Sequence, residues 1–114
     1  PKDGSLSIGN VKTFCYDVLL YTLNSNILGF LAHDGELFSE MDKRQKATIF
    51  KIILDQIKNS SLQYLVNIGD TSFNEILNDD TGILNDEDKE LIKTKVILQI
   101  SEDQNTWLFG QKFD

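Results

Sequence analysis

An apolar run that ends abruptly in a carboxylate is the feature that most constrains how this chain folds. Residues 27–32 read Ile-Leu-Gly-Phe-Leu-Ala, and His33, Asp34 and Gly35 follow directly. A run this short, with polar residues on both sides, is typical of a strand that is buried on both faces of a sheet. Because ligands of parallel sheets bind beyond the carboxyl ends of the strands, Asp34 is predicted to lie where it can hold Mg²⁺ or orient a water molecule.

Helical periodicity flanks this run on both sides. Apolar residues recur at helical spacing from Asn10 to about Asn24, and again from Asp42 to Lys58, which predicts two amphipathic helices. Residues 62–68 form a second strand-like run. Strand, helix and strand in this order predict an α/β fold with a parallel βαβ core and a right-handed crossover.

Two short helices are predicted after the second strand. Ser72 and Glu75 have the spacing of a capping box, which predicts a helix over residues 73–77. Asn85 is predicted to cap another helix over residues 86–93.

The last third of the chain changes character. Residues 95–101 and 106–113 are β-rich runs separated by four polar residues, which predicts an antiparallel hairpin. We find no repeat, low-complexity tract or linker, so residues 1–114 are predicted to form a single domain. The chain begins at Pro1 and reaches its first motif within a few residues, so we expect it to be a fragment of a longer protein.

The composition argues against several classes of protein. A net charge of −7 disfavours autonomous nucleic-acid binding, and the basic cluster of Lys43, Arg44 and Lys46 is interpreted as the solvated face of a helix. One cysteine, Cys15, and one histidine cannot form a disulfide or a Cys/His zinc site. The apolar run at residues 27–32 is far shorter than the roughly 20 residues of a membrane span, so we expect no membrane association and a cytoplasmic protein.

Four segments of the chain, taken in order, carry a family resemblance. Residues 6–10 read Leu-Ser-Ile-Gly-Asn, residues 28–34 end in Asp34, Met41-Asp42 follows, and residues 64–67 read Tyr-Leu-Val-Asn. They resemble the signature motif, the Walker B strand, the D-loop and the next strand of SMC-like, ABC-type ATPases of the chromosome-repair group. The chain looks most like the uncharacterised bacterial domain that closes certain SMC-like coiled-coil ATPases. The resemblance therefore implies a partial P-loop ATPase lobe.

The resemblance assigns a nucleotide-binding role to four residues. Ser7 and Gly9 would contact the γ-phosphate of ATP held by the opposite subunit, and Asp42 and Asn67 would lie in the D-loop and switch region. A hydroxyl and free N–H groups at a helix N-terminus suit an anion. The alternative is that Ser7 only caps the helix and Gly9 only forms a turn.

The acidic end of the first strand departs from the family pattern of Asp followed by Glu. If Asp34 is the Mg²⁺ ligand, Gly35 occupies the catalytic position and Glu36 must substitute for it. If Asp34 is instead the catalytic residue, His33 occupies the metal position. His33 could also act as a general base. A structural alternative is that Asp34 caps a turn and His33 packs at the strand end.

Two functions follow from the resemblance. The first is the C-terminal part of an ATPase head that binds and hydrolyses ATP with Mg²⁺, with DNA repair or defence as the implied setting. It would pair with an N-terminal Walker A lobe of the same protein, form an ATP-dependent head dimer and reach DNA through other regions. The alternative is a non-catalytic binding or scaffold domain that keeps the ATPase fold, because the family's switch histidine is absent and Asn67 occupies its region.

Overall fold

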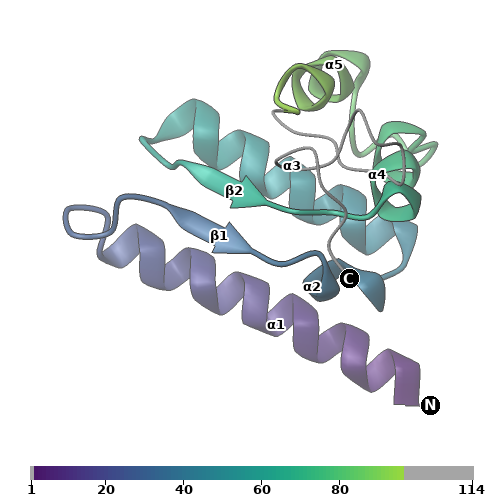
Figure 1. Cartoon of the computed structure of the whole chain (residues 1–114), viewed down its shortest axis with the longest axis horizontal. Coiled ribbons are helices and arrows are strands. Elements are labelled where there is room, and N and C mark those ends of the chain that lie inside the picture. Colours follow the sequence, from purple (N-terminus) through teal and green to yellow (C-terminus); the bar gives the residue numbers. More distant parts are fainter. Residues whose placement is uncertain (1, 97–114) are drawn as a thin grey trace, which may run out of the picture.

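The computed structural model describes residues 2–96, which form five helices and two strands (Figure 1). Their order is α1 (Lys2–Leu23), β1 (Leu31–His33), α2 (Glu36–Ser39), α3 (Lys43–Asn59), β2 (Tyr64–Val66), α4 (Asp70–Leu77) and α5 (Asp86–Thr94). Within these residues the fold is mixed and mostly helical. No helix in this part of the chain has the length and hydropathy needed to cross a bilayer.

The two strands, which precede and follow α3 in the sequence, pair in parallel. Leu31 lies opposite Tyr64, and His33 lies opposite Val66. The predicted parallel strand-helix-strand unit is therefore confirmed. Both strands are shorter than predicted. Strand β1 starts late because Ile27 lies in the turn that ends α1, where its N–H donates to the carbonyl of Asn24 at 2.9 Å.

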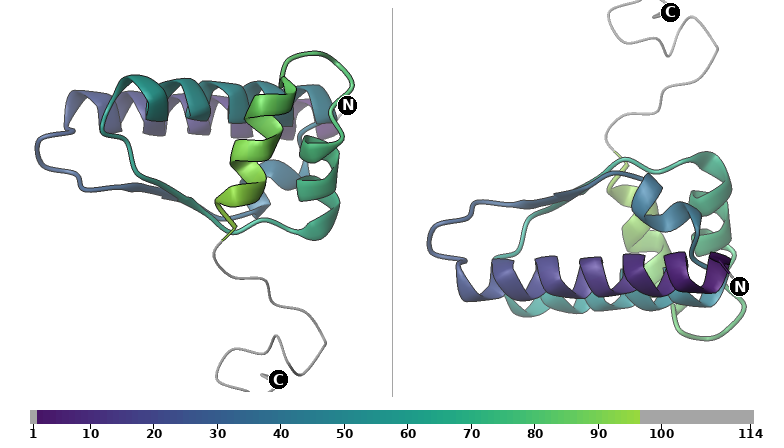
Figure 2. Two further views of the ribbon diagram at one scale, coloured as in Figure 1. Left: turned by 90° about the horizontal axis from the view of Figure 1, so that it is seen from above. Right: turned by 90° about the horizontal axis from the view of Figure 1, so that it is seen from below.

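Both long helices cover the same face of the sheet. Figure 2 shows α1 and α3 side by side, and in both views β1 and β2 lie together on one side of this helix pair. The opposite face is open within residues 2–96, where Ala32 is exposed and Leu65 is 41% exposed. The prediction of a strand buried on both faces is therefore wrong for the described residues. Parallel sheets are normally covered on both faces, so this open face is unusual.

Helix α1 begins at Lys2, well before the predicted start at Asn10. Its inward side chains follow a helical spacing that starts upstream of that residue: Ser7, Val11, Phe14, Val18 and Tyr21. Gly9 lies inside the helix, where glycine costs about 1 kcal/mol relative to alanine but does not end it. The prediction that residues 6–10 open a helix is thus wrong, and the N–H groups there belong to the helix interior.

The other helices pack around α3. The rings of Phe38 in α2 and Phe50 in α3 pack at a tilted angle with centroids 5.6 Å apart, and Ile76 of α4 is fully buried in the same cluster. Lys46 is only 4% exposed and its ammonium lies 3.1 Å from the Glu75 carboxylate. The interpretation of Lys46 as part of a solvated face is therefore wrong.

The predicted helix caps have mixed outcomes. Asn85 caps α5 as predicted, by accepting a 2.7 Å hydrogen bond from the N–H of Asp88. Asp42, for which no cap was predicted, caps α3. Helix α4 instead begins at Asp70 with Gly69 as its N-cap, so the predicted Ser72–Glu75 capping box does not form. Lys95 is the C-cap of α5 and not the first residue of a strand. The rest of the predicted hairpin lies outside the described residues.

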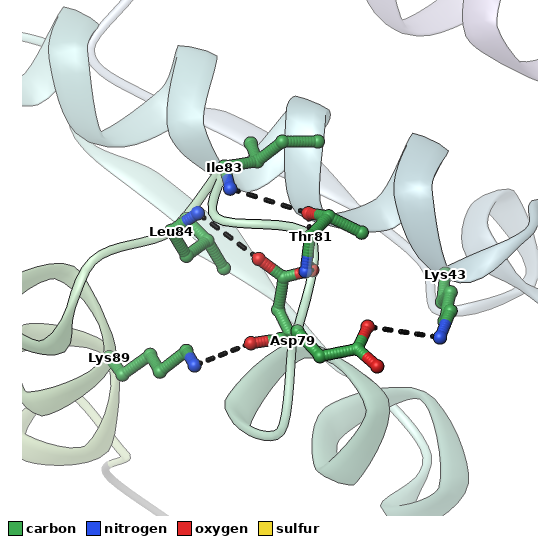
Figure 3. A network of polar contacts seen from close by, with 7 residues as sticks. Lys43, Asp79, Thr81, Ile83, Leu84 and Lys89 are labelled. Carbon is green, nitrogen blue, oxygen red and sulfur yellow. Dashed lines mark hydrogen bonds and ion pairs between the residues drawn. The ribbon is translucent and has the colours of Figure 1, made fainter.

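A buried carboxylate organises the loop between α4 and α5 (Figure 3). Asp79 accepts hydrogen bonds from the Thr81 hydroxyl at 2.6 Å and from the N–H of Leu84 at 3.1 Å. Lys89 donates to the Asp79 carbonyl at 2.6 Å. Between them, Gly82 has a φ of +82°, which glycine adopts without strain. Every one of these partners belongs to the loop or to α5, so the cluster fixes the chain path.

Candidate functional site

The carboxyl ends of β1 and β2 meet at one edge of the sheet. The residues there line an open surface depression, and they are Ala32, His33, Asp34, Leu65, Val66 and Asn67. Parallel pairing brings the ends of the two strands together, so that Gly35, which follows Asp34, contacts Asn67 although 32 positions separate them in the sequence. Asp34 directly follows β1, so its predicted position at the carboxyl end of a strand is confirmed.

Asp34 presents an exposed carboxylate at this edge. One oxygen, Oδ1, accepts a 3.2 Å hydrogen bond from the N–H of Glu36, and the Asp34 carbonyl accepts from the N–H of Leu37 at 3.0 Å. These bonds turn the chain directly into α2. The other carboxylate oxygen makes no hydrogen bond to the side chains and backbone that the structure describes, so it is open to a ligand. Glu36, in the first turn of α2, is also exposed.

Gly35 lies so close to the end of β2 that a side chain does not fit. Its N–H donates a 2.6 Å hydrogen bond to Oδ1 of Asn67. A Cβ at this position would lie 2.8 Å from the Asn67 carbonyl oxygen and 3.3 Å from the Ile68 Cα. Both of those atoms belong to the backbone, so neither moves easily. The position that follows Asp34 is therefore closed to a glutamate side chain, and Glu36 is the next carboxylate along the chain.

The His33 ring lies between α1 and the side chain of Tyr64 in β2. Its Nε2 is 2.7 Å from the Asp17 carboxylate, and its Nδ1 is 2.8 Å from the Tyr64 hydroxyl. Phe14 packs against the ring with centroids 5.7 Å apart. Because both ring nitrogens already have partners, the ring is engaged on the helix-covered side of the sheet. Of His33 and Asp34, only Asp34 has a polar side-chain atom without a hydrogen bond to the described residues.

Ser7 and Asp42 meet at a third residue, Gln45 of α3. The Ser7 hydroxyl donates to Oε1 of Gln45, and the same oxygen accepts from the N–H of Asp42 at 3.0 Å. The Asp42 carboxylate accepts in turn from the N–H of Gln45 at 2.7 Å. Ser7 is therefore neither a helix cap nor at a helix N-terminus. It joins the second turn of α1 to the first turn of α3.

Gly9 is exposed on α1, one turn or less from Ser7 in the helix. An added Cβ there would meet nothing within 4 Å. Packing within the described residues therefore does not require a glycine at this position.

The edge of the sheet offers few side chains that could bind a metal ion. Residues 2–96 hold no group of three or more His, Cys, Asp or Glu side chains that could bind a metal ion. Mg²⁺ commonly takes one or two protein carboxylates and completes its shell with water and phosphate oxygens. Asp34, with one free oxygen beside an open depression, fits that requirement.

Three residues of this region were not predicted from the sequence. Asp17, Tyr64 and Gln45 each bind a predicted site residue through a long-range hydrogen bond. Tyr64 could have been found by alternation, because the parallel register places it on the same side of the sheet as His33. Asp17 and Gln45 carry no comparable signal, since their partners lie on distant segments.

Comparison with known families places the chain in a bacterial family. Residues 1–113 match the model of the family described as "Uncharacterised protein conserved in bacteria (DUF2326)", and the chain belongs to it. The search of curated proteins found no match, and the search of solved structures also found none. Membership confirms the predicted bacterial domain family, and the relation to SMC-like ATPases stays a prediction.

Proposed function

We propose that this chain is the C-terminal lobe of an SMC-like, ABC-type ATPase head that contributes to ATP binding and hydrolysis. The observation that carries the proposal is the exposed Asp34 carboxylate at the carboxyl end of a parallel strand, beside Asn67 of the neighbouring strand end. The order of elements supports it as well. A long helix precedes β1, a short helix follows Asp34, and Asp42 caps the helix that leads to β2.

In this proposal each residue has a distinct task. Mg-ATP, when bound, supplies the phosphoryl group and a cation that neutralises its developing charge. Asp34 would hold the cation, and Glu36 would orient the attacking water, because the Asn67 backbone leaves no room for a glutamate at position 35. Gly9 offers an uncrowded helix surface to a nucleotide held by an opposite subunit. Ser7 would need to exchange its hydrogen bond with Gln45 for one to phosphate.

An N-terminal Walker A lobe of the same protein is the partner that this proposal requires. Most of the affinity for nucleotide in P-loop proteins comes from a glycine-rich loop with a lysine. Residues 4–9 have the glycine spacing, but Asn10-Val11 stands where Lys-Ser or Lys-Thr is needed. The open face of the β1–β2 pair, with Leu65 exposed, supports a second lobe that covers it. An ATP-dependent head dimer, a cytoplasmic location and contact with DNA through other regions belong to the same proposal.

One observation favours a second function, a binding or scaffold domain that keeps the fold without hydrolysis. The backbone of Asn67 closes position 35 to the catalytic glutamate of the family pattern. If Glu36 cannot replace that residue, the head binds nucleotide and does not turn it over.

Sedimentation and phosphate release distinguish these functions. In the complete gene product, an ATPase head should dimerise with Mg-ATP and release phosphate, and Glu36→Gln should stop release while keeping the dimer. A scaffold should release no phosphate with or without Glu36. Phosphate release that is unchanged in Glu36→Gln would contradict the role given to this residue.

A further inference from the structure

A chain of hydrogen bonds runs behind Asp34 on the helix-covered side of the sheet. It joins Asp17 of α1, His33 of β1 and Tyr64 of β2 through contacts of 2.7 and 2.8 Å. The His33 side chain is 8% exposed and that of Asp17 is 33% exposed. Three elements that are distant in the sequence thus meet at the residue that directly precedes the candidate magnesium ligand.

The donors and acceptors of this chain match without a gap. A carboxylate only accepts, so the His33 ring donates its Nε2–H to Asp17, while Nδ1 pairs with the Tyr64 hydroxyl. Burial, with a smaller contribution from the charge of Asp17, raises the pKa of Tyr64 far above its ordinary value, so this hydroxyl keeps its proton. Phe14 and Tyr64 pack against the ring with centroids 5.7 and 5.5 Å away. The ring is therefore fixed in both position and orientation.

Asp34 is held through its two neighbours in the chain. The side chain of His33 is bound on one side of the sheet, and the N–H of Gly35 is bound to Asn67 of β2. The Asp34 carboxylate itself makes one long hydrogen bond of 3.2 Å, to the N–H of Glu36. Its position therefore depends more on these anchors than on its own contacts.

We propose that Asp17 and Tyr64 are positioning residues that hold Asp34 in place by fixing the His33 ring. The proposal rests on the proposed function, because it assigns these residues to the magnesium-binding carboxylate of that site. Neither residue touches nucleotide. Asp17 also links β1 to α1, the helix that contains Gly9. The same hydrogen bond therefore connects the candidate magnesium site with the candidate contact to the opposite subunit.

Hydrogen exchange of the complete gene product without nucleotide tests the positioning directly. Asp17→Ala and Tyr64→Phe each remove one hydrogen bond, and exchange should rise several-fold in residues 31–38 while residues 70–94 stay unchanged. Asp17→Asn keeps an acceptor for Nε2–H and should restore most of the protection. Asp55→Ala, which removes an exposed carboxylate of α3, is the matched control. Unchanged exchange in residues 31–38, or an equal rise in both segments, would overturn the proposal.

Steady-state kinetics supply the second measurement. A displaced carboxylate slows the chemical step more than it weakens binding, so Asp17→Ala should lower kcat about tenfold and leave KM for Mg-ATP within about twofold. Asp17→Asn should recover most of kcat. A change in KM alone would overturn the positioning role. If Asp34→Asn hydrolyses ATP like the parent, the proposed function fails, while the exchange experiment still decides whether Asp17 and Tyr64 hold this segment.

Discussion

The N–H of Gly35 donates a 2.6 Å hydrogen bond to the side-chain oxygen of Asn67, which ties the ends of the two parallel strands together. The same approach places the Asn67 backbone where a side chain on residue 35 would be. One contact thus fixes the edge of the sheet and determines which residue can follow Asp34.

Gly35→Ala should destabilise the chain. Its Cβ would lie 2.8 Å from a backbone oxygen, and forced overpacking of this kind typically costs about 1–3 kcal/mol. Urea denaturation of residues 1–114 measures this loss in the free energy of unfolding. Gly29→Ala is the control, because nothing lies within 4 Å of the Cβ it adds. An equal effect of both substitutions would contradict the close approach.

Gly9→Ala should stabilise the fold and weaken ATP-dependent dimerisation. Alanine in an exposed helix interior is more favourable than glycine by about 0.5–1 kcal/mol, so the free energy of unfolding should rise by that amount. If Gly9 meets a nucleotide across a head dimer, the same variant should weaken ATP-dependent dimerisation of the complete protein. A stabilised variant that dimerises like the parent would return Gly9 to an ordinary helix position.

The sequence predicts the fold best where hydrophobic spacing and capping agree. The apolar spacing predicts a helix over residues 42–58, and α3 runs over Lys43–Asn59 with Asp42 as its N-cap. The start of α1 was missed because Gly9 suggested a break, whereas the buried spacing from Ser7 to Phe14 continues through it. Strand β1 is shorter than expected, since Ile27 forms part of a turn despite its β propensity.

The site could be predicted only in part from the sequence. Asp34 is identifiable because a strand end places it, and its neighbour Asn67 follows from parallel pairing. The partners of His33 and Ser7 could not be predicted, because a hydrogen bond between distant segments leaves no local pattern. The structural alternative for His33, packing at the strand end, agrees with its contacts to Phe14 and Tyr64.

Acid should weaken the loop between α4 and α5 through Asp79. Burial alone would raise the pKa of Asp79, but hydrogen bonds from Thr81 and from the N–H of Leu84 outweigh it and hold the pKa below its ordinary value. A carboxyl with a lowered folded-state pKa stabilises the fold above its unfolded pKa of about 3.9, and this contribution is lost as pH falls through the folded value.

Asp79→Asn should therefore lower the free energy of unfolding by about 1–3 kcal/mol at pH 7, because it replaces a charged acceptor of buried donors. The difference from the parent should shrink as pH is lowered below about 4. Urea denaturation at both pH values measures it. Asp80→Asn removes an exposed ion pair with Lys43 and should have little effect. A difference that does not depend on pH would contradict the role of the Asp79 charge.

Residues 1–114 alone should bind Mg-ATP weakly. The chain has no P-loop, and a net charge of −7 repels a polyanion, so we expect a Kd of about 1 mM or weaker, which corresponds to about −4 kcal/mol. Titration calorimetry gives this value. Micromolar affinity would mean that the nucleotide site is complete within this chain.

The most direct test of the central claim is ATP hydrolysis by the complete protein with Asp34→Asn. The exchange removes one charge from an exposed side chain, so the fold and its melting temperature should be unchanged. Loss of a carboxylate that holds Mg²⁺ should lower kcat on the order of 100-fold or more. Hydrolysis at the parental rate in a folded Asp34→Asn variant would contradict the assignment of this edge of the sheet as the magnesium nucleotide site.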